Sequence, residues 1–269
     1  MQDLPIGVFD SGLGGLTIVR ALKATLPHES LIYFGDTAHL PYGDKSPALI
    51  RGYCEKIALF LKEVPVKAIV IACNTASAVA LKEVKQAAGD IPVYDVVFPA
   101  AKYALSISKK GKIGVAATKT TIHSHIYRHL LTENAHSPIE VREKATPLLV
   151  PMIEEGWLHN RLSQEVIDAY MSDTSFEDID TLILGCTHYP LIKDQIQFYF
   201  ERNERDICVI DSSIAVAEYV REQLGDRKLL HLGDKSEQDR FYLSDFSQHF
   251  QATARLFLGE EIVFHKKEL

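Results

Sequence analysis

The sequence predicts an α/β protein made of two pseudo-symmetric parallel-sheet α/β domains. Short apolar runs alternate along the chain with segments whose apolar residues recur at helical spacing. The apolar runs lack strict alternation of apolar and polar residues, as strands do when both faces of a parallel sheet are covered. One such run, together with the turn after it, occurs in each half of the chain. These observations favour repeated strand–helix–strand units.

Seven runs rich in Val, Ile, Leu or Phe are predicted strands, because each lies next to Gly, Pro, Asp or Ser. They span residues 6–9, 31–34, 68–72, 93–97, 113–116, 181–185 and 207–210. After the second run, Ile50, Cys54 and Ile57 have the spacing of an amphipathic helix within residues 47–63.

The repeated feature is a buried-type strand that ends in a cysteine and a hydroxyl-bearing turn. Residues 68–75 (AIVIACNT) resemble residues 181–188 (TLILGCTH), and an Ile-Gly-Val strand precedes each, at 6–8 and 113–115. The similar spacing suggests a duplicated α/β unit with one cysteine in each copy. The alternative is that such strand–turn motifs recur by chance in α/β proteins.

The repeat predicts a domain division. The first domain is expected to comprise residues 1–97 plus 208–269, and the second domain residues 98–207. In this division the last predicted strand and the tail beyond it return to the first domain.

The composition is that of an ordinary globular chain of 269 residues, 46% hydrophobic and 24% charged. There are 29 Lys and Arg against 36 Asp and Glu, and this net charge of −7 argues against nucleic acid as the main partner. No apolar run reaches the ~18 residues of a membrane span, and the N-terminal residues lack a signal-peptide pattern. We therefore expect a cytoplasmic protein that binds neither membrane nor nucleic acid, and whose four cysteines are thiols.

Cys73 and Cys186 are the candidate reactive groups. Each follows a predicted strand, where parallel sheets place ligand sites, and a helix is predicted after each. A helix N-terminus lowers the pKa of a nearby thiol and favours thiolate. The alternative for each is a small buried hydrophobe, which is the usual role of a free cysteine. Cys54 and Cys208 have only this second interpretation and are predicted core residues.

Two loops could also meet a ligand. The glycine-rich turn from Asp10 to Thr17 lacks the third glycine of a dinucleotide-binding motif, but its N–H groups suit a carboxylate or a phosphate. Asp10 could act on a proton or an amine, or could simply cap the helix that follows. Tyr42 and Gly43 follow the second strand and could contact a ligand, although Pro41 and Gly43 also fit a plain β-turn.

The histidines divide into two kinds. His123, His125 and His129 lack the spacing of a metal site, and we interpret them as part of a solvated helix. His188 lies two residues after Cys186 and could protonate or orient a reacting group, or make a structural hydrogen bond.

Taken together, four motifs resemble those of the glutamate racemases, in the cofactor-independent aspartate/glutamate racemase superfamily. They are DSGLGG at 10–15, GDTAHLPYG at 35–43, ACNTA at 72–76 and LGCTHYP at 184–190. They occur in the family's order and span nearly the whole chain, so the combination is far more specific than any one motif.

The resemblance implies an active site between the two domains. It implies catalytic roles for Cys73 and Cys186. It implies that substrate is bound by Asp10, Ser11, Tyr42, Gly43, Asn74, Thr75, Thr187 and His188. Less specifically, Thr118 and Thr121 resemble a further carboxylate-binding turn, and Asp36 and either Glu154 or Glu155 match assisting acids.

Two thiols suit racemisation because the reaction removes the Cα proton from one face and returns a proton to the other. One cysteine must start as thiolate and the other as thiol, with the roles exchanged in the reverse direction. The resemblance further implies interconversion of L- and D-glutamate without cofactor or metal, supply of D-glutamate for peptidoglycan, and a homodimer. The alternatives are a racemase of aspartate or a related amino acid, and a non-catalytic binding protein on the same fold.

Overall fold

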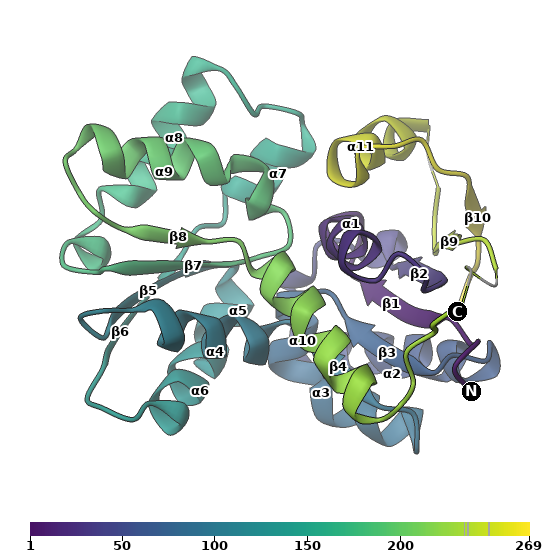
Figure 1. Ribbon diagram of the computed structural model, residues 1–269. Helices are drawn as coiled ribbons and strands as arrows, with labels where there is room; N and C mark the ends of the chain where they lie inside the picture. Colours follow the sequence, from purple (N-terminus) through teal and green to yellow (C-terminus); the bar gives the residue numbers. More distant parts are fainter. Residues whose placement is uncertain (234, 236, 247) are drawn as a thin grey trace.

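In a computed structural model, which describes residues 1–233, 235, 237–246 and 248–269, the chain forms two parallel sheets (Figure 1). The six-stranded sheet has the order β10-β9-β2-β1-β3-β4, and the four-stranded sheet has the order β6-β5-β7-β8. The six strands of the first sheet are β1 (Ile6–Asp10), β2 (Leu31–Gly35), β3 (Ala68–Ile71), β4 (Val93–Asp95), β9 (Arg240–Leu243) and β10 (Phe264–Lys266). The second sheet contains β5 (Lys112–Ala117), β6 (Glu140–Ala145), β7 (Thr181–Gly185) and β8 (Cys208–Ile210).

The two sheets share one strand order, which supports the predicted duplication. The run β2-β1-β3-β4 in the first sheet corresponds to the run β6-β5-β7-β8 in the second. In both runs the cysteine follows the third strand, so Cys73 after β3 and Cys186 after β7 hold equivalent positions. The unit of β9 and β10 extends the first sheet beyond this repeat. The predicted fold class of two pseudo-symmetric parallel-sheet domains is therefore confirmed.

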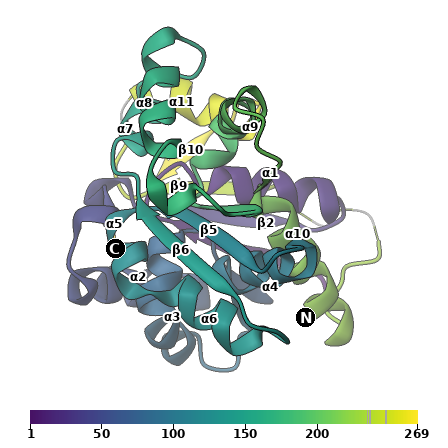
Figure 2. The ribbon, with the colours of Figure 1, turned by 90° about the vertical axis from the view of Figure 1, so that its left-hand side faces the viewer.

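Helices cover both faces of each sheet, as the continuous apolar runs predicted (Figures 1 and 2). The helices are α1 (Leu16–Thr25), α2 (Pro47–Glu63), α3 (Asn74–Ala88), α4 (Val97–Ile107), α5 (Lys119–Ser124), α6 (Ile126–Asn134), α7 (Leu149–Glu154), α8 (Arg161–Met171), α9 (Lys193–Arg202), α10 (Ser212–Asp226) and α11 (Gln248–Leu258). Short 3₁₀ helices are η1 (Thr37–His39), η2 (Tyr42–Asp44), η3 (Thr174–Phe176) and η4 (Tyr189–Ile192). The helix predicted over residues 47–63 is α2, with the same bounds.

The core divides at the first sheet and is continuous between the domains. Alternate residues of one strand face opposite sides, so Val8 and Phe9 belong to different apolar clusters. The Phe9 cluster fills the side covered by α2 and α3. The Val8 cluster continues into the second domain, where it includes Val115 and Leu182. This shared core holds the two sheets in a fixed relation.

All seven predicted strands are present. Three further strands were not predicted, and one predicted strand was assigned to the wrong sheet. β6 has the sequence EVREKA and lies at a sheet edge, so charged side chains mask it. β9 and β10 are short, half-exposed and near the end of the chain. The expectation that residues 207–210 return to the first domain is wrong, because β8 pairs with β7 in the second sheet. The other predicted domain boundaries remain predictions.

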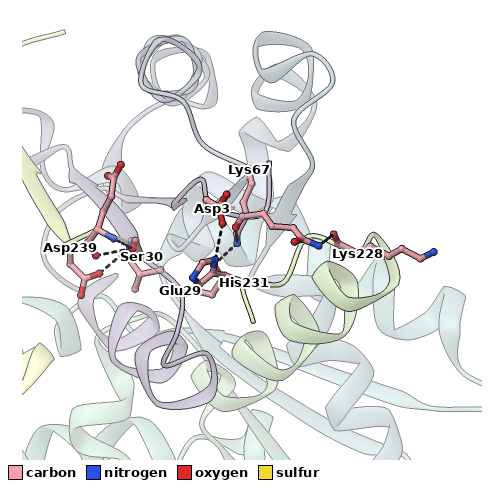
Figure 3. Close-up of polar contacts among 10 residues, drawn as sticks. Asp3, Glu29, Ser30, Lys67, Lys228, His231 and Asp239 are labelled. Carbon is pink, nitrogen blue, oxygen red and sulfur yellow. Dashed lines mark hydrogen bonds and ion pairs between the residues drawn. The ribbon is translucent and has the colours of Figure 1, made fainter. Parts of the chain in front are cut away.

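A buried ion pair fixes the N-terminal segment to the first sheet (Figure 3). The Lys67 ammonium, just before β3, contacts the Glu29 carboxylate, and their side chains are 0% and 2% exposed. Lys67 also donates to the Gln2 carbonyl at 2.6 Å, and Glu29 accepts from the His231 N–H at 2.9 Å. These bonds satisfy both charges where water is excluded.

In the part of the chain that the structure describes, no helix has both the length and the apolar character needed to span a membrane.

Replacing Lys67 with methionine should destabilise the protein strongly. The substitution would leave Glu29 buried without its cation, a change that costs about 3–5 kcal/mol. Urea unfolding followed by circular dichroism measures the free energy of unfolding. The matched control is Arg161→Met, which breaks an exposed ion pair with Glu165 and should change stability by less than about 1 kcal/mol. Equal losses in the two variants would contradict this interpretation of the buried pair.

Candidate active site

A cavity of about 160 Å³ lies where the carboxyl ends of the strands of both sheets meet. Its volume corresponds to a few water molecules, so it suits a small molecule rather than a polymer. Nearly all the site residues predicted from the sequence line it, from both domains: Ser11, Tyr42, Gly43, Cys73, Asn74, Thr75, Cys186, Thr187 and His188. The exception is Asp10, which is fully buried behind the cavity wall.

Cys73 follows β3 and is the N-cap residue of α3. Its Sγ accepts the Ala76 N–H at 3.4 Å and lies 3.6 Å from the Ser11 hydroxyl, to which it donates. Burial raises the pKa of this thiol to about 12, and the nearby Asp10 carboxylate adds to the increase. The expectation that the helix N-terminus lowers the pKa of Cys73 is therefore wrong. The Ala76 N–H does favour the thiolate, but burial and the Asp10 charge outweigh it.

Asp10 ends β1 directly behind the glycine-rich turn. Its Oδ2 accepts the Gly12 N–H at 2.9 Å, whereas its buried Oδ1 has no hydrogen-bond partner among the described residues. Burial raises the pKa of Asp10, and the His188 charge opposes that increase. A Cβ at position 15 would lie 2.4 Å from the Asp10 Cβ, so this turn needs glycine at 15 to pass so close. Asp10 thus places a buried carboxyl group behind the cavity wall, close to Cys73.

Cys186 has a different set of neighbours. Its Sγ lies 3.8 Å from His188 Nδ1, and His188 Nε2 lies 3.0 Å from Oε1 of Glu154 on α7. Burial alone would lower the pKa of His188, but the contacts with Cys186 and Glu154 outweigh it and raise the pKa to about 10. These contacts favour the protonated imidazole, which lies between the Cys186 sulfur and the Glu154 carboxylate. Glu155, the sequence alternative to Glu154, is exposed and does not line the cavity.

The hydroxyl groups of Thr75 and Thr118 lie on one wall of the cavity, and that of the buried Thr121 lies behind them. The Oγ1 atoms of Thr75, Thr118 and Thr121 lie 2.9, 3.0 and 3.3 Å apart in a triangle. Beside them, the Asn74 amide donates to the Tyr127 hydroxyl at 2.8 Å, and its buried Oδ1 has no hydrogen-bond partner among the described residues. This wall can donate to a carboxylate through the hydroxyls and accept from an ammonium through the amide oxygen.

The loop after β2 closes the cavity from the first domain. Tyr42 lines the cavity, and its hydroxyl donates to Asp36 at 2.6 Å, so Asp36 contacts a cavity residue without lining the cavity itself. The Gly43 carbonyl accepts from the Thr120 hydroxyl of α5 at 2.8 Å. A Cβ at Gly43 would lie 3.0 Å from the Thr118 Cβ, so glycine lets the loop reach the second domain.

The glycine-rich turn touches the second domain directly, a contact that sequence reasoning missed. A Cβ at Gly14 would lie 2.4 Å from His188 Nδ1 and 2.5 Å from Thr187 Oγ1. The Thr17 hydroxyl lies 2.9 Å from the Thr187 carbonyl and donates to it. The glycines of the turn were the only signal in the sequence, because the partners lie at least 170 residues away.

The remaining candidates lie outside the site. His123, His125 and His129 are exposed, as expected for a solvated region, and His125 and His129 pair with Glu143 and Glu133. His125 has a φ of 54°, which separates α5 from α6 where one helix was expected. Among the described residues no group of three or more His, Cys, Asp or Glu side chains is arranged to hold a metal ion.

Cys54 and Cys208, the two cysteines outside the candidate site, differ in their exposure to solvent. Cys54 is buried in the core, as predicted. The prediction that Cys208 is also a core residue is wrong, because it is exposed. β8 is an edge strand whose other two residues, Val209 and Ile210, are buried while Cys208 is not.

Comparison with known proteins agrees with this arrangement. A family model described as Asp/Glu/Hydantoin racemase matches residues 16–220, and the chain belongs to this family. The chain is an amino-acid racemase by family, and within the family it is most readily compared with the glutamate racemases. The glutamate racemase of Neisseria meningitidis serogroup C is 45% identical over 255 residues, which cover 95% of this chain and 93% of the relative.

Two further relatives are similar over nearly their full lengths. The glutamate racemase of Chlorobaculum tepidum is 44% identical over 262 residues, covering 97% of this chain and 94% of the relative. The crystal structure of glutamate racemase from Francisella tularensis in complex with D-glutamate superposes with a TM-score of 0.91 at 39% identity. That comparison covers 100% of this chain and 98% of the relative's.

Replacing Gly14 with alanine should lower racemase activity by about 10²-fold, because the new methyl group must displace Thr187 and His188. Initial rates of racemisation, followed by loss of optical activity, measure the effect. The control is Gly52→Ala on α2, where a Cβ meets nothing within 4 Å and activity should be unchanged. A fully active Gly14→Ala variant would show that this close approach is not needed for the reaction.

Proposed function

We propose that this protein interconverts L-glutamate and D-glutamate by a two-thiol acid/base mechanism that needs neither metal nor cofactor. The observation that carries the proposal is the placement of Cys73 and Cys186 at equivalent strand ends of two repeated units, both on one small cavity. Equivalent positions in facing units can present one sulfur to each side of a bound Cα. That is the geometry in which one group removes a proton and the other supplies one without turning the substrate.

The thiols need help because neither alone accounts for a useful rate. A positioned acid or base contributes about 10²–10⁴-fold, whereas enzymes generally reach at least about 10⁶-fold. The remainder must come from binding and from donors aimed at the charge that builds on the α-carboxylate as Cα loses its proton. The Thr75, Thr118 and Thr121 hydroxyls form such a donor group.

Asp10 lies behind the cavity wall and has no direct contact with a bound substrate. The ammonium group of the substrate has one matching acceptor, Asn74, which lines the cavity and whose Oδ1 has no hydrogen-bond partner among the described residues. An ammonium bound here would bring a positive charge close to Cys73, whose pKa burial raises to about 12. A nearby positive charge favours the thiolate, so substrate binding would itself promote the deprotonation of Cys73.

On the side of the cavity that the second domain forms, His188 and Glu154 favour the loss of the Cys186 proton. The His188 imidazolium lies 3.8 Å from Cys186 Sγ and stabilises negative charge there when the thiol gives up its proton. The Glu154 carboxylate, 3.0 Å from His188 Nε2, balances the imidazolium. In one direction Cys73 takes the Cα proton and Cys186 donates one, and in the other direction the roles are exchanged.

The choice of glutamate rests on the relatives. The curated proteins compared above are named glutamate racemases, and the Francisella structure holds D-glutamate. We further propose that the enzyme acts in the cytoplasm as a homodimer and supplies D-glutamate for peptidoglycan, as the family resemblance implies. Aspartate is the competing substrate, and the assay below separates the two.

The direct test is chiral chromatography of the products formed from each enantiomer of glutamate and of aspartate. Dialysed, chelator-treated protein without pyridoxal phosphate should convert either glutamate enantiomer to a racemic mixture. It should act on aspartate at least about 10-fold more slowly, a loss that one methylene can produce. Faster turnover of aspartate would reject the substrate assignment, and activity that requires added metal or pyridoxal phosphate would reject the mechanism.

Cys73→Ser and Cys186→Ser should each lower racemisation by about 10²–10⁴-fold or more. Serine is far too weak an acid to replace a thiol without an added base. Cys54 is buried but lies outside the cavity, so Cys54→Ser should retain turnover in the folded protein. Cys208 is exposed, and Cys208→Ser should behave as wild type. If Cys73→Ser kept wild-type turnover, the two-thiol assignment would be wrong.

A further inference from the structure

The C-terminal helix α11 reaches across the first domain to the catalytic residues of the second. α11 packs on α1, and Figure 1 shows it on the side of the first domain that faces α7, the helix that carries Glu154. Phe257, in the last turn of α11, is fully buried. Its ring centroid lies 5.1 Å from that of His188, with the ring planes at 83°.

This contact comes from outside the repeated unit. α11 connects β9 to β10, the two strands that extend the first sheet beyond the strand order shared by both domains. The addition therefore contributes a side chain to a residue of the second domain. Phe257 does not line the cavity, so it has no direct contact with a bound substrate.

The other neighbours of His188 leave one degree of freedom open. Cys186 at Nδ1 and Glu154 at Nε2 fix the two directions in which the imidazole can exchange protons. Gly14 packs against Nδ1 and prevents the ring from shifting toward the first domain. An edge-to-face aromatic neighbour restricts the remaining motion, which is tilting of the imidazole plane. It also excludes water from the flank of the ring.

We infer that Phe257 is a positioning residue for the racemase reaction, and that its ring holds His188 in the orientation that serves Cys186. This inference rests on the proposed two-thiol function. In this near-perpendicular arrangement, an imidazolium edge directed at the face of Phe257 is attracted to it more strongly than a neutral imidazole edge. The charged or titratable groups that act on His188 from the other packed elements are Cys186, Glu154 and Asp10.

Phe257→Leu removes the aromatic ring and keeps an apolar side chain. Loss of the aromatic pair should lower kcat about two- to thirteenfold. KM should change by less than twofold, because Phe257 lies outside the cavity wall. Phe257→Tyr retains the ring and should restore most of kcat. The matched control is Phe176→Leu, the same substitution at a fully buried phenylalanine of the second domain core.

A second measurement is independent of activity. In the full-length protein labelled with ¹⁵N-histidine, the imidazole signals of His188 can be assigned by their loss in His188→Gln. In Phe257→Leu the imidazole should lose its proton at lower pH than in wild type, while Phe176→Leu should leave the titration unchanged. An unchanged His188 titration in folded Phe257→Leu would overturn the inference.

The two measurements separate the inference from the function on which it rests. If wild-type protein did not racemise glutamate but the His188 titration moved in Phe257→Leu, the proposed function would fail while the positioning of His188 by Phe257 stood. If wild type were active and Phe257→Leu matched it in kcat, the positioning role in the reaction would fail alone. Equal kcat losses in Phe257→Leu and Phe176→Leu would likewise overturn it in favour of general destabilisation.

Discussion

The contact between the glycine-rich turn of the first domain and the Thr187–His188 turn of the second is the constraint on which the site depends. Gly14 allows the His188 and Thr187 side chains to lie against the backbone of the turn, at a distance that a side chain at position 14 would prevent, and the Thr17 hydroxyl donates to the Thr187 carbonyl. The cores of the two domains are continuous behind this contact. Cys73 and Cys186 therefore face one small cavity rather than a wide interdomain gap.

The repeat is symmetric in backbone and asymmetric in chemistry. Both cysteines follow the third strand of the same strand order, yet the neighbour of Cys73 is the Asp10 carboxyl group and the neighbour of Cys186 is the His188 imidazole. A racemase acts on two mirror-image substrates, so matching backbone positions suit the two faces of Cα. The carboxylate, ammonium and side chain of the substrate nevertheless differ from one another. Different partners for the two thiols suit the different surroundings of the two faces of Cα. The helix α11 adds to this asymmetry, because Phe257 contacts His188 outside the repeat.

The sequence predicted the parts of this protein whose physical cause is local. The apolar runs predicted seven strands, the spacing of Ile50, Cys54 and Ile57 predicted α2, and the motifs placed nearly all the site residues on one cavity. The edge strand β6 was not predicted, because its charged residues are typical of an exposed segment and give no apolar pattern of a paired strand.

Properties that arise only when distant segments pack together could not be predicted. The raised pKa of Cys73 reflects burial and the position of Asp10, which the helix N-terminus alone does not reveal. The preference for Glu154 over Glu155 depends on which side of α7 faces His188. The exposure of Cys208 follows from the edge position of β8, which depends on the pairing of β8 with β7.

Hydrogen isotope exchange in D₂O tests the central claim of two thiols on opposite faces of Cα most directly. At low conversion, product formed from either enantiomer should carry solvent deuterium at Cα, while recovered substrate should carry none. The thiolate on one face takes the substrate proton, and the thiol on the other face, already exchanged with solvent, delivers deuterium. A single base would return part of the abstracted proton and would also label recovered substrate. Substantial unlabelled product at low conversion, from either enantiomer, would contradict the two-thiol account even if both cysteines proved essential.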